Sequence, residues 1–186
     1  MNSTARVVVI GGGVVGVSTL YHLAKKGWSD VMLLERKELT SGSTWHAAGL
    51  LPLFNLSYSV GQIHNYSVGL YQKLEAETGQ HVGFRQVSNI RLARTKDRFD
   101  EYMYYAGVAQ TIGVKVNILT PAEVKEIWPL CETDGLIGAI QHPDDGYIQP
   151  ADLTQALAKG ARAMGAAIHR NTTVTGIDRL PTGEWR

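Results

Sequence analysis

The N-terminal part of the sequence places an apolar run directly before a glycine-rich turn, as in a dinucleotide-binding βαβ unit. Four consecutive apolar residues, Val7–Ile10, lead into Gly11-Gly12-Gly13-Val14-Val15-Gly16. The β-branched run predicts a strand that is buried on both faces. In the G-x-G-x-x-G motif, Gly11 permits a tight turn, Gly13 lets the backbone approach a pyrophosphate, and Gly16 lets the next helix pack closely on the strand.

The residues after the turn complete this unit. A helix is expected from about Val14 to Lys26, with its N-terminal N–H groups directed at a diphosphate. A second strand, Val31–Leu34, then delivers Glu35 to the offset at which a carboxylate accepts hydrogen bonds from the adenosine ribose. Arg36 has two open interpretations, which are stacking near the adenosine or simple exposure to solvent.

The next segment bears on which dinucleotide is bound. Residues 39–44 are mostly small and hydroxyl-bearing, which suits a loop that hydrogen-bonds phosphate and ribityl oxygens. Residues 45–50 then become small and apolar, as expected where backbone lies against an extended ring system. This pattern favours FAD over NAD. By spacing alone, His46 is an ordinary loop histidine that hydrogen-bonds its own backbone.

Several segments resemble the dimethylglycine and sarcosine dehydrogenases, a family of D-amino-acid-oxidase-like FAD-dependent oxidoreductases. Besides the glycine motif, they are Glu35-Arg36, Leu39–Leu50 with its Ser-Thr-Trp-His-Ala-Ala-Gly element, Leu74–Gly79 and Asp145–Pro150. The resemblance implies that His46 is joined covalently to the flavin 8α-methyl group and that the backbone of Val174 contacts the adenine. The predicted cofactor-binding residues are Gly11, Gly13, Val14, Val15, Gly16, Glu35, Arg36, Gly42, Ser43, Thr44, Trp45, His46, Ala47, Ala48, Gly49, Leu50 and Val174.

The resemblance also implies an α/β fold with two parts. We expect a Rossmann-like FAD-binding βαβ domain from residues 1–80 and 150–186, and part of an α+β substrate domain from residues 81–149. The implied activity is oxidation of N-methyl groups of small amino acids such as dimethylglycine or sarcosine. Hydride would pass to the flavin, with formaldehyde or methylene-folate as product and tetrahydrofolate bound by a C-terminal module beyond this chain. No catalytic residue is predicted within these 186 residues.

Two other interpretations remain open at this point. One is a non-catalytic regulatory relative of the same family, against which His46 and Trp45 argue. The other is an NAD-dependent dehydrogenase, against which the hydroxyl-rich loop after Glu35 argues.

Charge and composition narrow the range of partners. The formal net charge is +1, from 18 basic and 17 acidic residues, so neither a nucleic-acid partner nor an anionic membrane surface is expected. The histidines lack metal-ligand spacing, and no metal is predicted. The early start of the first strand leaves no room for a targeting peptide, which predicts a cytoplasmic protein, or a mitochondrial matrix protein if a leader was removed.

Further along, the pattern predicts helices over 60–79, 97–112, from 121 and from 150, and a strand over 167–170. Thr120, Pro121 and Glu123 form a predicted capping box. Strands are expected over 86–93, 114–119 and 136–141, and a hairpin from 174–179 and 184–186. His142, Asp144 and Asp145 are interpreted as turn residues rather than metal ligands.

Overall fold

The computed structural model describes residues 4–186 and has a mixed α/β architecture, as the sequence predicts. The chain forms two compact units. Unit 1 contains the N-terminal segment through Ala48, Lys73–Gly83 and Gln149–Arg186, and unit 2 contains Gly49–Gln72 and Phe84–Ile148. Compactness does not establish which segments bind a cofactor, so the division at residues 80 and 150 stays a prediction.

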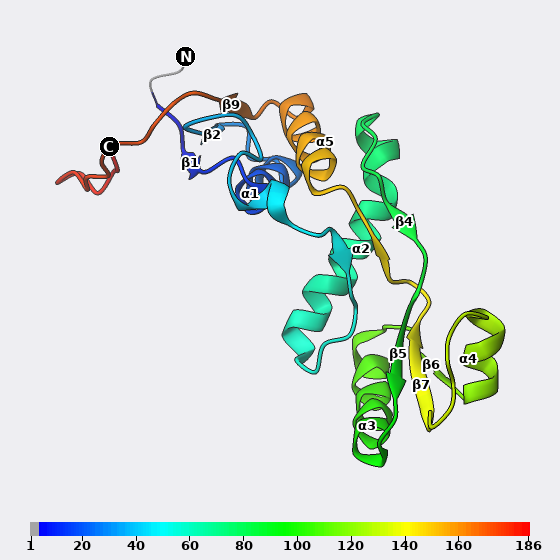
Figure 1. Cartoon of the computed structure of the whole chain (residues 1–186). Coiled ribbons are helices and arrows are strands. Elements are labelled where there is room, and N and C mark those ends of the chain that lie inside the picture. The colour runs from blue at the N-terminus through cyan, green and yellow to red at the C-terminus, as the bar shows by residue number, and fades with distance from the viewer. Residues whose placement is uncertain (1–3) are drawn as a thin grey trace. The chain divides into compact units, whose positions relative to one another are not determined.

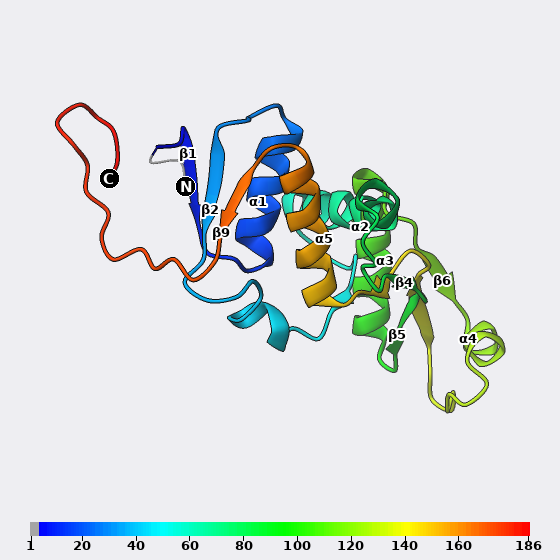
Figure 2. The ribbon, with the colours of Figure 1, turned by 90° about the horizontal axis from the view of Figure 1, so that it is seen from above.

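Unit 1 is built on a parallel three-stranded sheet of order β1-β2-β9. Figure 2 shows helices α1 and α5 on the same side of this sheet. The strands and helices are β1 (Val7–Ile10), β2 (Val31–Leu34), β9 (Ala167–His169), α1 (Val14–Lys25) and α5 (Pro150–Ala163). Their agreement with the predicted ranges follows from strong local patterns, including Gly27 just beyond α1 with φ +87°.

The prediction that β1 is buried on both faces is wrong. Val8 and Ile10 are 45% and 52% exposed, whereas Val7 and Val9 are half-buried. The cause is the position of β1 at the edge of a sheet with both helices on one side. The central strand β2 is the buried one, with Val31, Met32 and Leu33 at most 8% exposed.

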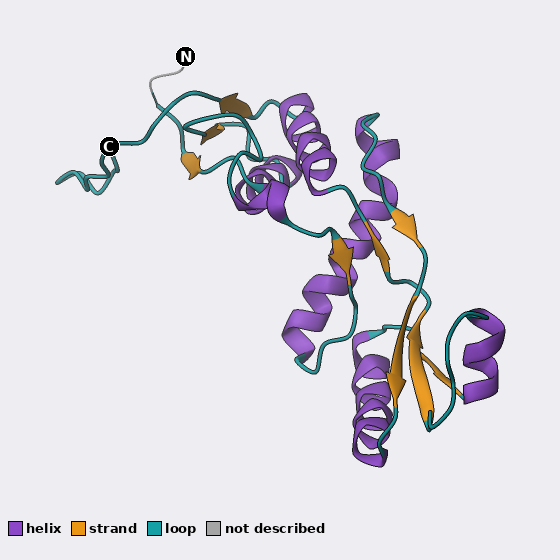
Figure 3. Cartoon of the chain, in the orientation of Figure 1, coloured by secondary structure: helices purple, strands orange, loops and turns teal. Residues whose placement is uncertain are grey.

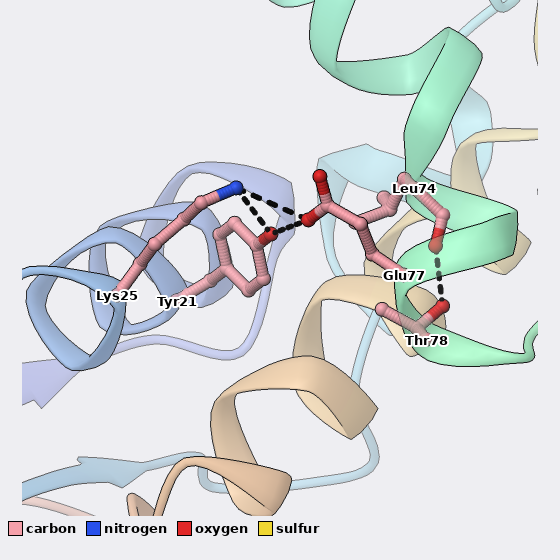
Figure 4. A network of polar contacts seen from close by, with 5 residues as sticks. All are labelled: Tyr21, Lys25, Leu74, Glu77 and Thr78. Carbon is pink, nitrogen blue, oxygen red and sulfur yellow. Dashed lines mark hydrogen bonds and ion pairs between the residues drawn. The ribbon is translucent and has the colours of Figure 1, made fainter.

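The helices of unit 1 meet at Tyr21, which is 2% exposed. Its hydroxyl donates to Glu77 Oε2 at 2.7 Å, and Lys25 Nζ lies 3.1 Å from both the Tyr21 hydroxyl and Glu77 Oε2 (Figure 4). On the α5 side, a Cβ added at Gly160 would lie 2.8 Å from Cε2 of the Tyr21 ring. Close packing of α1, α5 and the end of α2 therefore depends on a glycine at position 160.

Unit 2 contains two antiparallel three-stranded sheets, of order β3-β8-β4 and β5-β7-β6 (Figures 1 and 3). Its elements are β3 (Leu50–Leu51), β4 (Arg85–Gln86), β5 (Asn89–Ala93), α3 (Lys96–Ile112), β6 (Asn117–Leu119), α4 (Pro121–Ile127), β7 (Gly138–His142) and β8 (Gly146–Tyr147). Helix α2 (Tyr58–Thr78) begins in unit 2 and ends in unit 1.

The β5-β7-β6 sheet has a helix on each face. On one face, Ile140 and Ala93 pack with Tyr102 and Tyr105 of α3. On the other face, Ala139 and Leu119 pack with Val124 of α4. The predicted capping box of α4 is confirmed, because Glu123 N–H donates to the Thr120 hydroxyl and the Glu123 carboxylate accepts from Thr120 N–H.

The strand predictions differ from the structure in three places. The predicted strand over 86–93 is divided at Ser88, whose φ is +70°. The strands predicted over 114–119 and 136–141 are instead Asn117–Leu119 and Gly138–His142. Residues 174–178 form no strand. The predicted hairpin is reduced to an antiparallel bridge between Arg179 and Trp185, flanked by backbone hydrogen bonds between Asp178 and Arg186 and from Leu180 N–H to Glu184 O. Residues 174–177 pair with no strand in the described part of the chain, and extended backbone without a partner does not form a sheet.

Candidate cofactor site

Gly11, in the turn after β1, and Gly16, near the start of α1, each occupy a position that disfavours a side chain, for different reasons. Gly11 has φ +108°, a conformation that favours glycine, and its N–H donates to Leu34 O at 2.9 Å. A Cβ added at Gly16 would lie 2.0 Å from the carbonyl oxygen of Gly11. The roles predicted for Gly11 and Gly16, a tight turn and close helix packing, therefore have a direct geometric basis.

Gly12 is a site residue that was not predicted from the sequence. Its N–H donates to Glu35 Oε2 at 2.6 Å, and an added Cβ would lie 2.7 Å from Leu39 Cδ2 and 2.8 Å from Glu35 Cγ. The sequence did contain a signal for Gly12. The motif requires glycine only at positions 11 and 13 of the Gly11-Gly12-Gly13 run, so the additional glycine at position 12 indicated a further constraint.

The Glu35 carboxylate lies at the carboxyl ends of β1 and β2. Besides the bond from Gly12, its Oε1 accepts from Lys37 N–H at 2.7 Å. These two backbone donors orient the carboxylate, whose remaining lone pairs can accept further hydrogen bonds. An ionised carboxylate here suits hydroxyl donors and repels a phosphate. Arg36, its neighbour, is exposed.

Thr44 brings the hydroxyl-rich loop onto the N-terminus of α1. Its hydroxyl oxygen accepts from Val14 N–H at 2.9 Å, and the side chain is 7% exposed. The local N-cap, Gly13, offers no side chain, and a Cβ there would lie 3.0 Å from Thr44 Oγ1. Two segments predicted separately as phosphate-binding are thus brought together at one helix N-terminus, where free N–H groups and the helix dipole favour an anion.

Trp45 and His46 lie on a short 3-10 helix, η1 (Ser43–His46), next to this point. Both side chains are exposed, and their ring centroids lie 3.9 Å apart with an interplanar angle of 35°. Ala47 and Ala48 are exposed as well. Since Thr44 anchors η1 from the buried side, the imidazole of His46 remains accessible to a molecule bound at the surface of unit 1.

The other predicted residues fall into three groups. Val15, Gly42 and Ser43 are exposed in the same region of unit 1. Val174 is half-buried in the segment after β9, which bonds to the segment after β2 through Thr172 N–H and Glu35 O at 2.8 Å. Gly49 and Leu50 belong to unit 2.

Unit 2 contains a buried polar cluster of Arg91, His142 and Asp145. His142 and Asp145 are 0% and 1% exposed. Within residues 4–186, neither His142 ring nitrogen nor Asp145 Oδ2 has a hydrogen-bond partner. Burial lowers the pKa of His142 to about 4, and the positive charge of Arg91 acts in the same direction. Burial also raises the pKa of Asp145 to about 6, against the opposing effects of the Leu53 N–H and Arg91. The local pattern, which is that of a surface turn, did not indicate this burial.

The described part of the chain contains no group of three or more His, Cys, Asp or Glu side chains that could bind a metal ion. None of the helices within residues 4–186 combines the length and the apolar character that crossing a membrane requires.

Comparison with known proteins assigns the family. A model of the DAO family, described as FAD dependent oxidoreductase, matches residues 6–186. The chain belongs to this FAD dependent oxidoreductase family. The mitochondrial dimethylglycine dehydrogenase of Rattus norvegicus is 46% identical over 181 residues, which are 97% of this chain and 21% of that enzyme. The mitochondrial sarcosine dehydrogenase of Homo sapiens is 44% identical over 176 residues, or 94% of this chain and 19% of that enzyme.

A solved structure supports the same fold. The L-proline dehydrogenase of P. horikoshii superposes with a TM-score of 0.88 at 29% identity, over 97% of this chain and 48% of that one. The predicted family resemblance and fold class are confirmed. The chain spans about a fifth of the length of the curated relatives, 21% and 19%, and the individual cofactor contacts stay predictions.

Proposed function

We propose that this chain forms the FAD-binding portion of an oxidoreductase acting on N-methyl groups of small amino acids such as dimethylglycine or sarcosine. The observation that carries the proposal is the placement of Thr44 on the N-terminus of α1, with the exposed His46 two residues further along. The identity to dimethylglycine and sarcosine dehydrogenases, 46% and 44%, supports the substrate class.

The residues present fit an FAD molecule. Gly11, Gly12 and Gly13 carry no side chains that would separate the backbone from a diphosphate, and Glu35 supplies an oriented acceptor for ribose hydroxyls. Ser43 and Thr44 supply hydroxyl groups beside the helix N-terminus, and Val174 would contact the adenine through its backbone. Arg36 would lie near the adenosine, and the backbone of Ala47–Leu50 would lie against the ring system.

We assign His46 as the attachment residue, through a bond from an imidazole nitrogen to the 8α-methyl carbon of the flavin. Neutral imidazole is a competent nucleophile, and the side chain of His46 is exposed. The new C–N bond would replace a C–H bond of the methyl group: the methyl carbon would lose a proton, the flavin would take up the electron pair, and molecular oxygen or another electron acceptor would reoxidise it. When bound, the flavin supplies the acceptor for a hydride from the N-methyl carbon, with formaldehyde or, in the presence of tetrahydrofolate, methylene-folate as product. The matching dimethylglycine and sarcosine dehydrogenases are mitochondrial enzymes, so we place the protein in the mitochondrial matrix, with the cytoplasm as the alternative.

An absorption spectrum of the full natural protein tests the proposal. We expect flavin bands that bleach on addition of sarcosine or dimethylglycine and a yellow chromophore that stays with acid-precipitated protein. H46A should release the chromophore into the supernatant, whereas H81A, at another exposed histidine, should retain it. A colourless protein would refute the FAD proposal and favour a regulatory relative, and a chromophore still attached in H46A would refute the linkage alone.

A further inference from the structure

The residues just before α5 hold the end of the predicted flavin-binding segment, Gly49–Leu50, and the residues that follow it. Ile148 N–H donates to Gly49 O at 2.8 Å. Strand β3 then pairs with β8, with Leu50 opposite Tyr147 and Leu51 opposite Gly146. All of these residues belong to unit 2, and the contacts lead along the chain towards Leu53.

Asp145 extends this set of contacts with its side chain. Its Oδ1 accepts from the N–H of Leu53 at 2.9 Å, and both residues are 1% exposed. The backbone oxygen of Asp145 accepts from Val87 N–H at 3.1 Å and from Ser88 N–H at 2.9 Å. One residue therefore joins the segment after β3 to the segment after β4.

The pairing of β8 with β4, next to Asp145, cannot easily change its register. A Cβ added at Gly146 would lie 2.1 Å from the carbonyl oxygen of Arg85, so the strands meet at backbone distance. Without Asp145, the buried N–H of Leu53 would lose its acceptor, and an unpaired buried donor costs about 1–3 kcal/mol. The Tyr105 hydroxyl donates to Leu53 O at 3.0 Å. Without the Asp145 carboxylate, this bond alone would hold the Leu53 backbone through a side chain.

A carboxylate is an expensive group to bury at this position. Asp145 Oδ2 has no hydrogen-bond partner in the part of the chain that the structure describes. Burial of an ionisable group with an unpaired oxygen costs free energy that an apolar side chain of similar size would avoid. An apolar side chain could not accept the hydrogen bond from Leu53 N–H, which is the function that requires a hydrogen-bond acceptor here.

We propose that Asp145 is a positioning residue for the flavin site, because it fixes Gly49–Leu53, the end of the segment that begins at Ser43. It acts through the backbone of that segment and does not contact the cofactor. This inference rests on the proposed function, in which Gly49 and Leu50 lie against the flavin ring system.

The test compares D145A and D145N in the full natural protein, with D144A as the matched control. Asp144 accepts from the amide of Gln86 at 3.0 Å and makes no contact with Leu53 that the structure records. Two quantities are measured: amide hydrogen exchange at Leu53, and the flavin-to-protein ratio with its absorption spectrum. D145A should speed exchange at Leu53 at least about fivefold and lower the flavin content with a shifted spectrum. D145N keeps an acceptor oxygen and should restore both, and D144A should change neither.

The inference is overturned if D145A matches the wild type in exchange and flavin, or if D145N is as impaired as D145A. If D145A does not fold, D145N decides alone, and loss of flavin or of protection at Leu53 in this variant overturns the inference. A wild-type protein without flavin fails the proposed function instead. Leu53 exchange in D145A then still shows whether Asp145 fixes the segment.

Discussion

The stability of the protein should depend on pH through two buried groups whose effects oppose one another. His142 and Asp145 lie on the same turn, and burial moves their pKa values in opposite directions, to about 4 and about 6. The groups that face them are Arg91 from β5, Asp144 from the turn and the Tyr105 ring from α3, 5.5 Å from the His142 ring centroid. Neither residue is among the causes of the other's pKa shift, so a substitution at one of them leaves the contribution of the other in place.

The signs follow from proton linkage. The pKa of Asp145 is raised from 3.8, so its contribution to stability is present at low pH and is lost as the pH rises through about 6. The pKa of His142 is lowered from 6.5, so its contribution is present above that value and is lost as the pH falls through about 4. Each pKa difference corresponds to a change of at most about 3 kcal/mol in the free energy of unfolding. About 2 kcal/mol of this change falls between about pH 7 and about pH 4.5.

The two variants D145N and H142F separate the contributions. The amide side chain introduced by D145N is not ionisable but keeps an acceptor for Leu53, and a Phe ring keeps the packing of His142 against Phe54 and Tyr105. From about pH 7 to about pH 4.5, the free energy of unfolding of D145N should fall by about 2 kcal/mol relative to wild type. That of H142F should rise by a similar amount relative to wild type, because this variant has no buried imidazole whose contribution is lost on acidification.

Urea unfolding at a series of pH values, followed by far-UV circular dichroism, measures these differences. Titration of all other groups is shared with the wild type and cancels. The reasoning is refuted if both difference curves are flat, or if the two variants change in the same direction. A pH-independent offset is expected in either variant and carries no weight.

Other substitutions test the cofactor site and its support. G16A should lower the free energy of unfolding by about 3 kcal/mol, because the added Cβ would lie 2.0 Å from Gly11 O. G42A places its Cβ in open space and should lower it by less than about 1 kcal/mol. Thermal melts of the two variants measure the difference. T44V removes the acceptor for Val14 N–H and should cost about 1–2 kcal/mol, which T44S restores. Y21F removes the bond to Glu77 and should cost about 1 kcal/mol, and an equal melting temperature to wild type would contradict it.

Local patterns predicted the βαβ unit well, because each of its signals acts over a few residues. The apolar run, the glycine turn, the helix and Glu35 all fall where the sequence placed them. The exposure of Val8 and Ile10 was not predictable, because it depends on which strands and helices lie beside β1. A β-branched run indicates a strand but not how many of its faces are covered.

The buried turn escaped prediction for a similar reason. Asp beside Pro and Gly is typical of a surface turn, and Asp145 does lie in one between β7 and β8. Leu53 N–H bonds to Asp145, and the rings of Phe54 and Tyr105 pack against His142 at the start of the turn. All three of these residues are distant from the turn in sequence. The bond from Val14 N–H to Thr44 likewise joins a helix to a loop, and neither local pattern specified that meeting.

The pairing of β2 with β9 has a consequence for synthesis of the chain. Leu33 lies opposite Ile168, and the whole of Phe84–Ile148 is made between these two strands. A ribosome therefore releases unit 2 before it releases β9, the third strand of the unit 1 sheet, so unit 2 can fold first. The glycine turn and Glu35 are translated before unit 2, but β9, the strand beside β2, joins them only after unit 2 has emerged.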